Sequence, residues 1–518
     1  MLKLEKDGDL YMELIYELNE IQLAVHQSVL QEKNLKTADF LGTVNILPNE
    51  YIRVQSNYFN QMLLGMFFPS ACPLNESLDS RLKAYQISDI YKSLTLRTFC
   101  NFNRMGYGKT VETIVHLRTT NAQRVLIVAP KAVHDQWKNH VIEWYPEMSD
   151  CTYIVRSSSG FTGILNYHKN DKLCVILNYE KLLQGPILNQ LRQYLWDMIV
   201  FDEAHYLKNR NSKRTKAAVL IPAKNRCLLT GTPVMAHYDD LWSMLNILGE
   251  KYSGQHYWPW VEKFCEIKDD FFGKKIVGPT RNERDLAHFK KYIDLISIRN
   301  PDLNLTQGKN VYTVTLQMEK SQRTFYNRIK KVLLEELPEN LTIANGAVKC
   351  VRLRQATSCP QILDSEQKSG VKFEWIKNFV ESTDEQVLIL TQFSFTIHLL
   401  NSYLDKTACS VHYGSLNERT KEIELNKFKN KETQVLIATI QSIGTGVDGL
   451  QNVCRLGIVI DADYSPENNS QAEDRLNRLG QKDLVCWYYL ECEKTFDQRV
   501  RKINDCKNKS IKELLISD

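Results

Sequence analysis

The sequence contains no C-x-x-C pair, although it has 13 cysteines. Cysteine-based zinc sites use closely spaced pairs and disulfide frameworks belong to short secreted chains, so neither is expected in 518 residues. The most apolar stretch, residues 62–72, is interrupted by Pro69 and is too short to span a bilayer. The N-terminus, MLKLEKDGDLYMEL, carries acidic residues, which is not typical of a signal or transit peptide. We therefore expect a cytoplasmic protein without membrane contact.

Short-period repeats and low-complexity tracts are also missing from the sequence. Hydrophobic residues make up 43% and charged residues 25%, as in globular proteins, and 518 residues suggest two to four domains. The net charge of +5 is mildly basic. Such a charge is compatible with a polyanionic partner but does not require one.

Short apolar runs followed by polar, helix-compatible segments occur in two groups. Uninterrupted apolar runs of this length are typical of parallel sheets that are buried on both faces. The first group is 124–130, 173–177, 196–201 and 226–230, and the second is 386–391, 408–413, 434–439, 457–460 and 485–490. They predict two α/β lobes at 81–255 and 366–518. Between them, 256–365 is expected to be a helical insertion and linker with a helix over 321–337, and 1–80 an N-terminal accessory domain of unknown type.

A glycine-rich turn, NRMGYGKT at 103–110, precedes a helix expected over 111–117. Such a turn presents backbone N–H groups to phosphate, and Gly106 and Gly108 allow close approach. Lys109 would bridge the β- and γ-phosphates and Thr110 would hold magnesium. The strict pattern G-x-x-x-x-G-K-[ST] is not met, because Asn103 stands in place of its first glycine. The alternative interpretation is a surface turn beside a lysine.

The acidic sequence Asp202-Glu203-Ala204-His205 follows the apolar run 196–201. A carboxylate at the end of a buried strand can reach a metal held near Thr110, so Asp202 is expected to hold magnesium through water. Glu203 would orient and deprotonate an attacking water. An ordinary acidic turn is the alternative, and an upstream phosphate loop makes it less favoured.

Taken together, these and further segments resemble the Swi/Snf-type double-stranded DNA translocases of the superfamily-two helicase-like ATPases. The resemblance covers about 81–503. In chain order, the similar segments are LKAYQ (82–86), VAPKAVHDQWKNH (128–140), ILNYEKL (176–182), FDEAHYLKN (201–209), LLTGTPVMAHYDDLWSMLNIL (228–248), LRQATSCP (353–360), VLILTQFS (387–394), HYGSLNERTKEIELNKF (412–428), VLIATIQSIGTGVDGLQ (435–451) and QAEDRLNRLGQ (471–481). The Arg-x-Gly-Gln ending of the last segment is especially specific.

This resemblance implies two tandem RecA-like parallel-sheet lobes with helical inter-lobe insertions and a small N-terminal domain. It implies ATP and Mg²⁺ as ligands, with Arg475 and Arg478 as arginine fingers. The implied nucleotide-binding positions also include Gln86, His205, Gly446, Asp448 and Gln471. The implied nucleic-acid contacts are Lys131, Gln136, Trp137, Gln392, Ser394, Tyr413, Gly414 and Thr439. For Trp137, core packing is an equally plausible interpretation.

The sequence departs from the family pattern in two places. Asn103-Arg104 replaces the usual Asp-Glu before the phosphate-loop Met-Gly. Gly446-Val447-Asp448 replaces the usual Gly-Leu-Asn. Because Lys109 and the loop glycines are intact, we expect ATP hydrolysis to be retained.

The expected function is ATP-driven movement along double-stranded or branched DNA by a monomer. Fork remodelling, branch migration, strand annealing or protein removal in replication, recombination or repair are the candidate tasks. The compact architecture favours a bacterial or phage protein, acting in the cytoplasm of a bacterial or virus-infected cell. Two alternatives remain: a conventional strand-separating DNA or RNA helicase, and a DNA-binding protein with a vestigial ATPase.

Overall fold

The structure of the protein is a computed structural model that describes residues 15–19, 22–26, 30–31, 33–41, 44–46, 51–55, 58–63, 78–104, 106–168, 171–231, 238–254, 256–270, 273–300, 308–335, 343–405, 407–444, 447–478 and 480–515. The chain divides into two compact units. The first comprises residues 1–104, 108–301 and 510–518, and the second comprises 105–107 and 302–509. Among the described helices, none combines the length and apolar character needed to cross a membrane.

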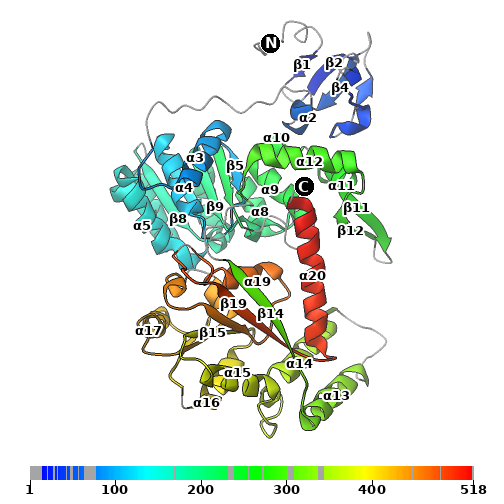
Figure 1. Ribbon diagram of the computed structural model, residues 1–518. Coiled ribbons are helices and arrows are strands. Elements are labelled where there is room, and N and C mark those ends of the chain that lie inside the picture. Colours follow the sequence, from blue (N-terminus) through cyan, green and yellow to red (C-terminus); the bar gives the residue numbers. More distant parts are fainter. Residues whose placement is uncertain are drawn as a thin grey trace. The chain divides into compact units, whose positions relative to one another are not determined.

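The first unit is built on a seven-stranded parallel sheet (Figure 1). Its strand order is β13-β5-β10-β9-β6-β8-β7. The strands are β5 (Phe99–Asn101), β6 (Arg124–Val128), β7 (Thr152–Ile154), β8 (Leu173–Leu177), β9 (Trp196–Asp202), β10 (Ala223–Leu229) and β13 (Ser297–Ile298).

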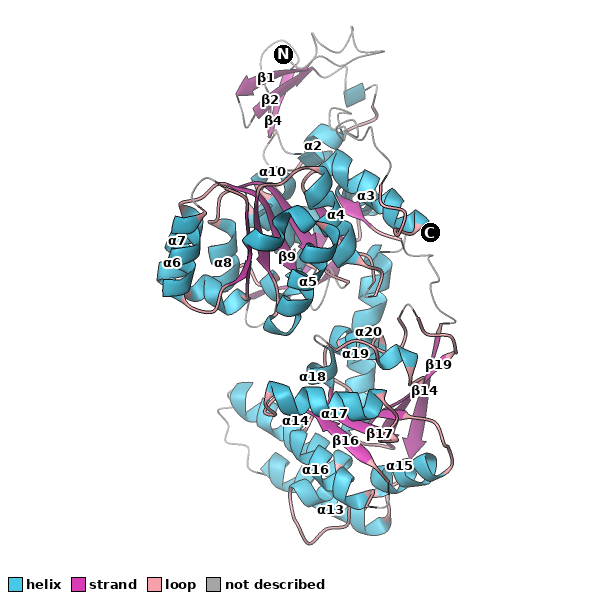
Figure 2. Cartoon of the chain, turned by 90° about the vertical axis from the view of Figure 1, so that its left-hand side faces the viewer, coloured by secondary structure: helices cyan, strands magenta, loops and turns pink. Residues whose placement is uncertain are grey.

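Helices cover both faces of this sheet, which explains why its central strands read as continuous apolar runs. Side chains alternate between the faces: Val125 and Ile127 pack against one group of helices, and Leu126 and Val128 against the other. One group is α3 (Ala84–Leu96), α4 (Lys109–Thr119) and α5 (His134–Trp144), which lie together in Figure 2. The other is α6 (Ser158–Tyr167), α7 (Gly185–Arg192), α8 (Lys213–Val219) and α9 (Asp240–Leu248).

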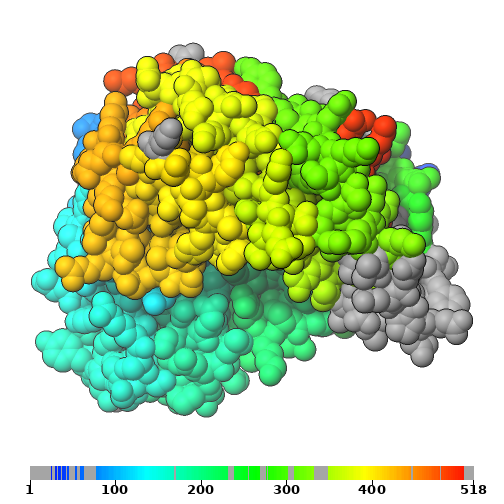
Figure 3. Space-filling view, turned by 90° about the horizontal axis from the view of Figure 1, so that it is seen from below, coloured from blue at the N-terminus to red at the C-terminus, as the bar shows by residue number. Residues whose placement is uncertain are grey.

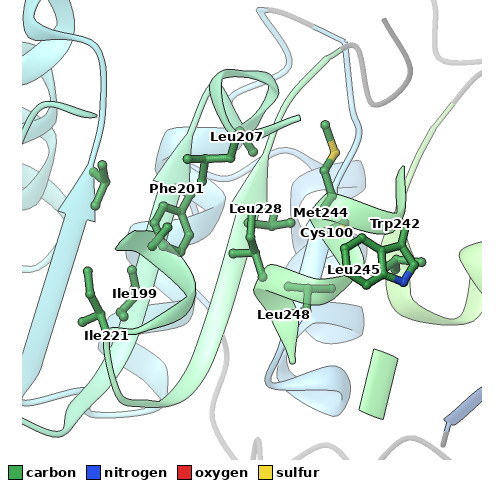
Figure 4. Packing of buried hydrophobic residues seen from close by; sticks show 14 of the residues in the cluster. Cys100, Ile199, Phe201, Leu207, Ile221, Leu228, Trp242, Met244, Leu245 and Leu248 are labelled. Carbon is green, nitrogen blue, oxygen red and sulfur yellow. The ribbon is translucent and has the colours of Figure 1, made fainter. Parts of the chain in front are cut away.

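The second face carries the larger core, part of which is shown in Figure 4. There Phe201 of β9 and Leu228 of β10 lie near Leu207 and near Leu245 of α9. All four side chains are buried. This core fixes the strand β9 that ends in the acidic sequence.

Further elements of the first unit lie outside the main sheet. Residues 1–80 contain a four-stranded antiparallel sheet of order β1-β2-β4-β3. Its elements are β1 (Ile15–Asn19), β2 (Gln22–His26), β3 (Asn45–Ile46), β4 (Tyr51–Gln55) and the helix α2 (Tyr58–Leu63). An antiparallel hairpin and three helices follow α9, namely α10 (Glu250–Ser253), α11 (Tyr257–Phe264), β11 (Cys265–Asp270), β12 (Gly273–Pro279) and α12 (Glu283–Ile296).

The second unit has a six-stranded parallel sheet of order β14-β19-β18-β15-β17-β16. Its strands are β14 (Lys309–Leu316), β15 (Val387–Thr391), β16 (Cys409–His412), β17 (Val435–Thr439), β18 (Leu456–Val459) and β19 (Val485–Cys492). Again the central strands are buried on both faces, as Ile389 and Leu390 of β15 belong to opposite cores.

The helices of this unit divide between the two faces of the sheet. One face is covered by α15 (Val371–Glu381) and α16 (Ser394–Tyr403), and the other by α17 (Glu418–Lys429), α18 (Ile440–Gly444) and α19 (Pro466–Glu473). The remaining helices are α13 (Lys320–Glu335), α14 (Ile343–Ser358) and α20 (Phe496–Leu515). In Figure 3 the yellow surface belongs largely to α15, α16 and their neighbours.

Two parallel-sheet α/β lobes are therefore present, as predicted, but the predicted boundaries of 256–365 are wrong. β13 joins the first sheet beside β5, and β14 joins the second beside β19. Only two residues form β13, and most of β14 is exposed, so neither carries an apolar run of the kind that predicted the central strands. The division between the lobes lies near residue 301.

Candidate active site

Three neighbouring strands of the first sheet bring the candidate ATP-binding residues to one edge. The glycine-rich turn follows β5, Asp202 ends β9, and β10 lies between them. Parallel strands present their carboxyl ends at the same edge, so the turn and the acidic sequence must converge there. The charges of Lys109 and Asp202 act on each other in the structure. The convergence predicted from sequence is thus present in the fold.

The turn leads directly into α4, which begins at Lys109. Its N-cap is Gly108, with φ of +85°, and no side chain of the described residues caps this end. The positive φ favours glycine at position 108, and a Cβ there would lie 2.4 Å from Nε2 of Gln86, so the glutamine side chain would have to move. Gln86, the predicted adenine contact, is therefore next to the turn. Uncapped N–H groups at a helix N-terminus, approached without a Cβ, fit a phosphate group.

The ammonium group of Lys109 lies within the turn. Its Nζ donates to the carbonyl oxygen of Asn103 at 2.8 Å and to that of Arg104 at 3.1 Å. Thr110 is partly buried in the first turn of α4. These two contacts place the ammonium group at the start of α4, inside the turn that is expected to bind phosphate.

Asp202 is held from three directions. Nε1 of Trp137 donates to Oδ2 at 2.7 Å, and the backbone N–H of Glu203 donates to Oδ1 at 3.0 Å. The hydroxyl of Tyr179 donates to the carbonyl oxygen of Asp202 at 2.6 Å. Burial, together with the charge of Glu203, raises the pKa of Asp202 to about 6, while Trp137 and Lys109 oppose the rise. A bound divalent cation would favour the ionised form of this carboxyl.

Glu203 has a left-handed backbone, with φ of +51° and ψ of +52°. A non-glycine residue in this region carries strain, which is often found at functional sites. Its Oε2 lies 3.2 Å from Nδ1 of His205, and both side chains are largely buried. The His205 ring is thus a close neighbour of the carboxylate that is expected to act as the base.

A buried polar network explains the departure at Asn103. Nδ2 of Asn103 donates to Asp89 at 2.6 Å, and its Oδ1 accepts the backbone N–H of Asn300 at 2.9 Å. The side chain of Asn300 also donates to Asp89, at 2.7 Å. Burial raises the pKa of Asp89, while the amides of Asn300 and Asn103 oppose the rise. An aspartate at 103 would place a second carboxylate against Asp89, which the amide avoids. Arg104 is exposed.

The candidate residues of the second unit also lie close together. Arg475 is buried and donates to the carbonyl oxygens of Gly444 and Val447, the second at 2.9 Å. These two carbonyls flank residues 445 and 446 in the sequence, and Gly446 lies outside the described residues. Arg478 pairs with Asp448 at 3.2 Å.

Asp448, which stands in place of the family's usual asparagine, is thus the ion-pair partner of Arg478, one of the two predicted arginine fingers. Burial acts to raise the pKa of Asp448, but the guanidinium of Arg478 holds it below its usual value. Gln471 is buried in α19, and a Cβ at Gly444 would lie 3.8 Å from it. Contact of any of these residues with nucleotide stays a prediction.

The candidate nucleic-acid contacts of the first unit differ in their exposure to solvent. Lys131 is exposed in a short 3₁₀ helix, and Gln136 is exposed in the first turn of α5, just beyond the carboxyl end of β6. Trp137 is only 1% exposed and packs in the core beneath α5. Its assignment as a nucleic-acid contact is wrong, because the helix turns this side chain inward, where its indole N–H reaches Asp202.

In the second unit, the candidates follow three adjacent strands. Gln392 and Ser394 come after β15, Tyr413 and Gly414 after β16, and Thr439 ends β17. Ser394 and Gly414 are exposed, and Gln392, Tyr413 and Thr439 are partly buried. Ser394 begins α16, whose N-terminal N–H groups suit phosphate. The fold therefore gathers these residues at one edge, and their contact with nucleic acid stays a prediction.

Sequence reasoning missed three residues that support the site. Tyr179 lay within the segment 176–182, but a motif does not reveal which backbone oxygen a buried hydroxyl reaches. Asp89 and Asn300 contact Asn103 from positions 14 and 197 residues away in the chain. No local pattern signals such a contact, and only the unusual Asn103 hinted that its surroundings differ.

Two family models match the chain. The model described as the SNF2-related domain matches residues 102–365, about half of the chain. The model described as the helicase conserved C-terminal domain matches residues 371–480. The first contains the glycine-rich turn and the acidic sequence, and the second contains Arg475 and Arg478.

The chain is also similar to curated relatives and to a solved structure. The DNA excision repair protein ERCC-6-like of Mus musculus is 25% identical over 481 residues, covering 76% of this chain and 38% of its own. The ISWI chromatin-remodeling complex ATPase ISW2 of Saccharomyces cerevisiae is 24% identical over 436 residues, covering 77% and 37%. The chain thus spans under two fifths of the length of these relatives. The Sulfolobus solfataricus SWI2/SNF2 ATPase core in complex with dsDNA is 21% identical, with a TM-score of 0.39, covering 87% of this chain and 94% of that one.

Proposed function

This chain belongs to the SNF2-related family of helicase-like ATPases, and on that premise we propose that it is a double-stranded DNA translocase driven by ATP hydrolysis. The observation that carries the proposal is the intact set of Lys109, Asp202 and Glu203 at the shared edge of β5, β10 and β9. A vestigial ATPase would have no need to keep Glu203 in a strained conformation beside His205.

The chain's own residues bind and orient the nucleotide. The N-terminus of α4 and the ammonium of Lys109 would take the β- and γ-phosphates, and Gln86 would contact the base beside the turn. Thr110 and Asp202 would hold Mg²⁺, for which hydroxyl and carboxylate oxygens are suitable ligands. When bound, Mg²⁺ supplies charge that balances the phosphate oxygens.

Glu203 would act as the general base. Its carboxylate accepts a proton from a water molecule as the water oxygen forms a bond to the γ-phosphorus and the bond to the ADP oxygen breaks. Its Oε2 lies 3.2 Å from Nδ1 of His205, so the imidazole is a close neighbour of the proposed base. Arg475 and Arg478 are proposed to contribute positive charge from the second unit.

The proposed DNA path uses residues at the carboxyl edges of both sheets. Lys131 and Gln136 in the first unit and Ser394 and Gly414 in the second are exposed at these edges. A lysine ammonium and the backbone N–H groups of a helix N-terminus contact phosphate rather than bases. Binding of this kind is independent of sequence and weakens as salt concentration rises.

The finer proposal concerns the DNA structure that the protein remodels. The sequence resemblance is to translocases in general, and within that class we propose forks and branched junctions as the substrates, for branch migration or annealing. The small domain in residues 1–80 is the proposed selector of DNA structure. Deleting it is expected to change DNA preference without abolishing basal ATP hydrolysis.

ATP hydrolysis should be measured without nucleic acid and with single-stranded DNA, blunt duplex, a four-way junction or RNA. The matched variant is Glu203→Gln, which keeps the shape and removes the base. We expect duplex or junction to stimulate hydrolysis, and the variant to lose about 10²- to 10⁴-fold in rate while still binding ATP. Stimulation by RNA or single strands alone would favour a conventional helicase. Tight DNA binding without hydrolysis would favour a DNA-binding protein with a vestigial ATPase.

A further inference from the structure

The inference concerns the two aromatic residues that hold Asp202. Nε1 of Trp137 donates to the side chain of Asp202 at 2.7 Å, and the hydroxyl of Tyr179 donates to its carbonyl oxygen at 2.6 Å. Both aromatic side chains are 1% exposed. Since Oδ1 accepts the N–H of Glu203, the orientation of the carboxylate is set by one bond to each oxygen.

Trp137 lies on an element that has an exposed side. In α5, Gln136 is exposed while the next residue, Trp137, is buried. Successive helical residues point about 100° apart, so a single turn presents one side chain outward and the next toward β9. Lys131, also exposed, lies in the 3₁₀ helix that leads into α5. The segment 131–137 therefore joins a surface with exposed polar groups to the carboxylate of Asp202.

Tyr179 is connected to the surface in a similar way. It begins a 3₁₀ helix over Tyr179–Leu183, and its ring stacks on Tyr206 at 5.3 Å. Tyr206 is 36% exposed and stacks in turn on His205 at 4.7 Å. Asp202 thus has two rigid aromatic neighbours. Of these two, Trp137 is the one that contacts the side-chain carboxylate, at Oδ2, whereas Tyr179 contacts the backbone carbonyl oxygen.

Small movements of α5 must act on Asp202, because the indole is rigid and is packed in the core. A hydrogen bond at 2.7 Å weakens steeply when its angle or length changes. A shift of the first turn on contact with phosphate would therefore reorient the carboxylate. Coupling between two sites requires either a continuous physical connection of this kind or a conformational equilibrium that both sites influence.

We propose that Trp137 is a positioning residue that couples nucleic-acid contact on residues 131–136 to the orientation of Asp202, and hence to the binding of the magnesium nucleotide. This inference rests on the proposed function, because it assigns the regulation of the same site. It replaces the role first expected for Trp137, direct contact with nucleic acid. By linkage, the nucleotide affects DNA binding by the same factor as DNA affects nucleotide binding.

The test uses Trp137→Phe, with Trp196→Phe as a matched control. Trp196 is also 1% exposed in the first unit, and its Nε1 donates to the carbonyl oxygen of Leu191 at 3.1 Å. Both substitutions remove one N–H donor and the same side-chain volume from a core of the first unit. Trp137 belongs to the core on one face of the sheet and Trp196 to the core on the other, and of the two only Trp137 contacts Asp202. Each variant is measured in the full chain.

The measurement is the equilibrium affinity for a fluorescent non-hydrolysable ATP analogue with Mg²⁺, with and without saturating duplex DNA. In the unmodified chain and in Trp196→Phe, we expect DNA to change this affinity by about 5- to 150-fold. In Trp137→Phe the change should fall to less than twofold, while affinity for DNA alone stays within twofold.

Equal coupling in the two variants, or its loss in both, would overturn the inference while leaving the proposed function intact. Absence of coupling in the unmodified chain would also overturn it. If DNA in addition failed to stimulate hydrolysis by that chain, the proposed function itself would fail.

Discussion

Replacing Asn103 with aspartate is a change of one amide group that restores the family's usual residue, yet the structure predicts that it destabilises this protein. Nδ2 of Asn103 lies 2.6 Å from a carboxylate oxygen of Asp89, and both residues are buried. In the variant, an oxygen would take the place of the donor. A charge-assisted hydrogen bond would become a contact between two acids.

The size of the effect follows from the separation of the charges. Two like charges about 4 Å apart repel by about 4 kcal/mol at an effective dielectric constant of 20. Protonation of one carboxyl limits the penalty, so we expect a loss of about 2 to 4 kcal/mol at pH 7. For a domain of this size, the melting temperature would fall by on the order of 5 to 15 °C.

The pH dependence has a definite sign. Crowding raises the pKa of the paired acids above the value in the unfolded chain, so the folded variant binds more protons at intermediate pH. The stability of the Asn103→Asp variant relative to the unmodified protein therefore decreases as pH rises. The deficit should be smaller at pH 5 than at pH 8.

Thermal melting of the unmodified chain, of Asn103→Asp and of Asn103→Asp with Asp89→Asn would test this reasoning. The double variant again pairs one carboxylate with one amide, so it should recover most of the lost stability. A single variant as stable as the unmodified chain at every pH would refute the interpretation of the network. So would a double variant that is less stable than the single one.

Two further predictions concern buried ionisable groups elsewhere. Burial lowers the pKa of His116 to about 3, so its stabilising contribution is lost as pH falls below about 6.5. His116→Asn should therefore reduce the decline in unfolding free energy between pH 6.5 and 4.5 by about 2.3 kcal/mol. Lys372 is fully buried beside Asp497 at 2.9 Å and Asp461 at 3.9 Å. Lys372→Met would leave two buried acids without their cation and should cost about 3 to 5 kcal/mol in chemical denaturation, whereas a cost under 1 kcal/mol would contradict this account.

The architecture was predictable wherever a strand is buried on both faces. The runs at 173–177 and 124–130 correspond to β8 and to the whole of β6, because such strands must be apolar throughout. β5, with three residues, and β13, with two, are too short to have a pattern. β14 is a largely exposed edge strand, so its sequence mixes polar and apolar residues and has no continuous apolar run.

The candidate site was predictable to the extent that it consists of contiguous motifs. The turn around Lys109 and the sequence from Asp202 to His205 are each local, and the order of the strands brings them together. The support of the site was not predictable, because it depends on side chains that meet only after folding. Trp137 shows this clearly: the sequence cannot say whether a tryptophan after a strand faces solvent or reaches a carboxylate.

The central claim is ATP-driven movement along intact duplex DNA. Displacement of a labelled third strand from a triplex at the end of a long duplex measures such movement directly, since the duplex strands need not separate. The account predicts ATP-dependent release of the third strand by the unmodified chain, no release by Glu203→Gln, and a duplex that stays paired. Rapid ATP hydrolysis without release of the third strand, or separation of the duplex strands themselves, would contradict it.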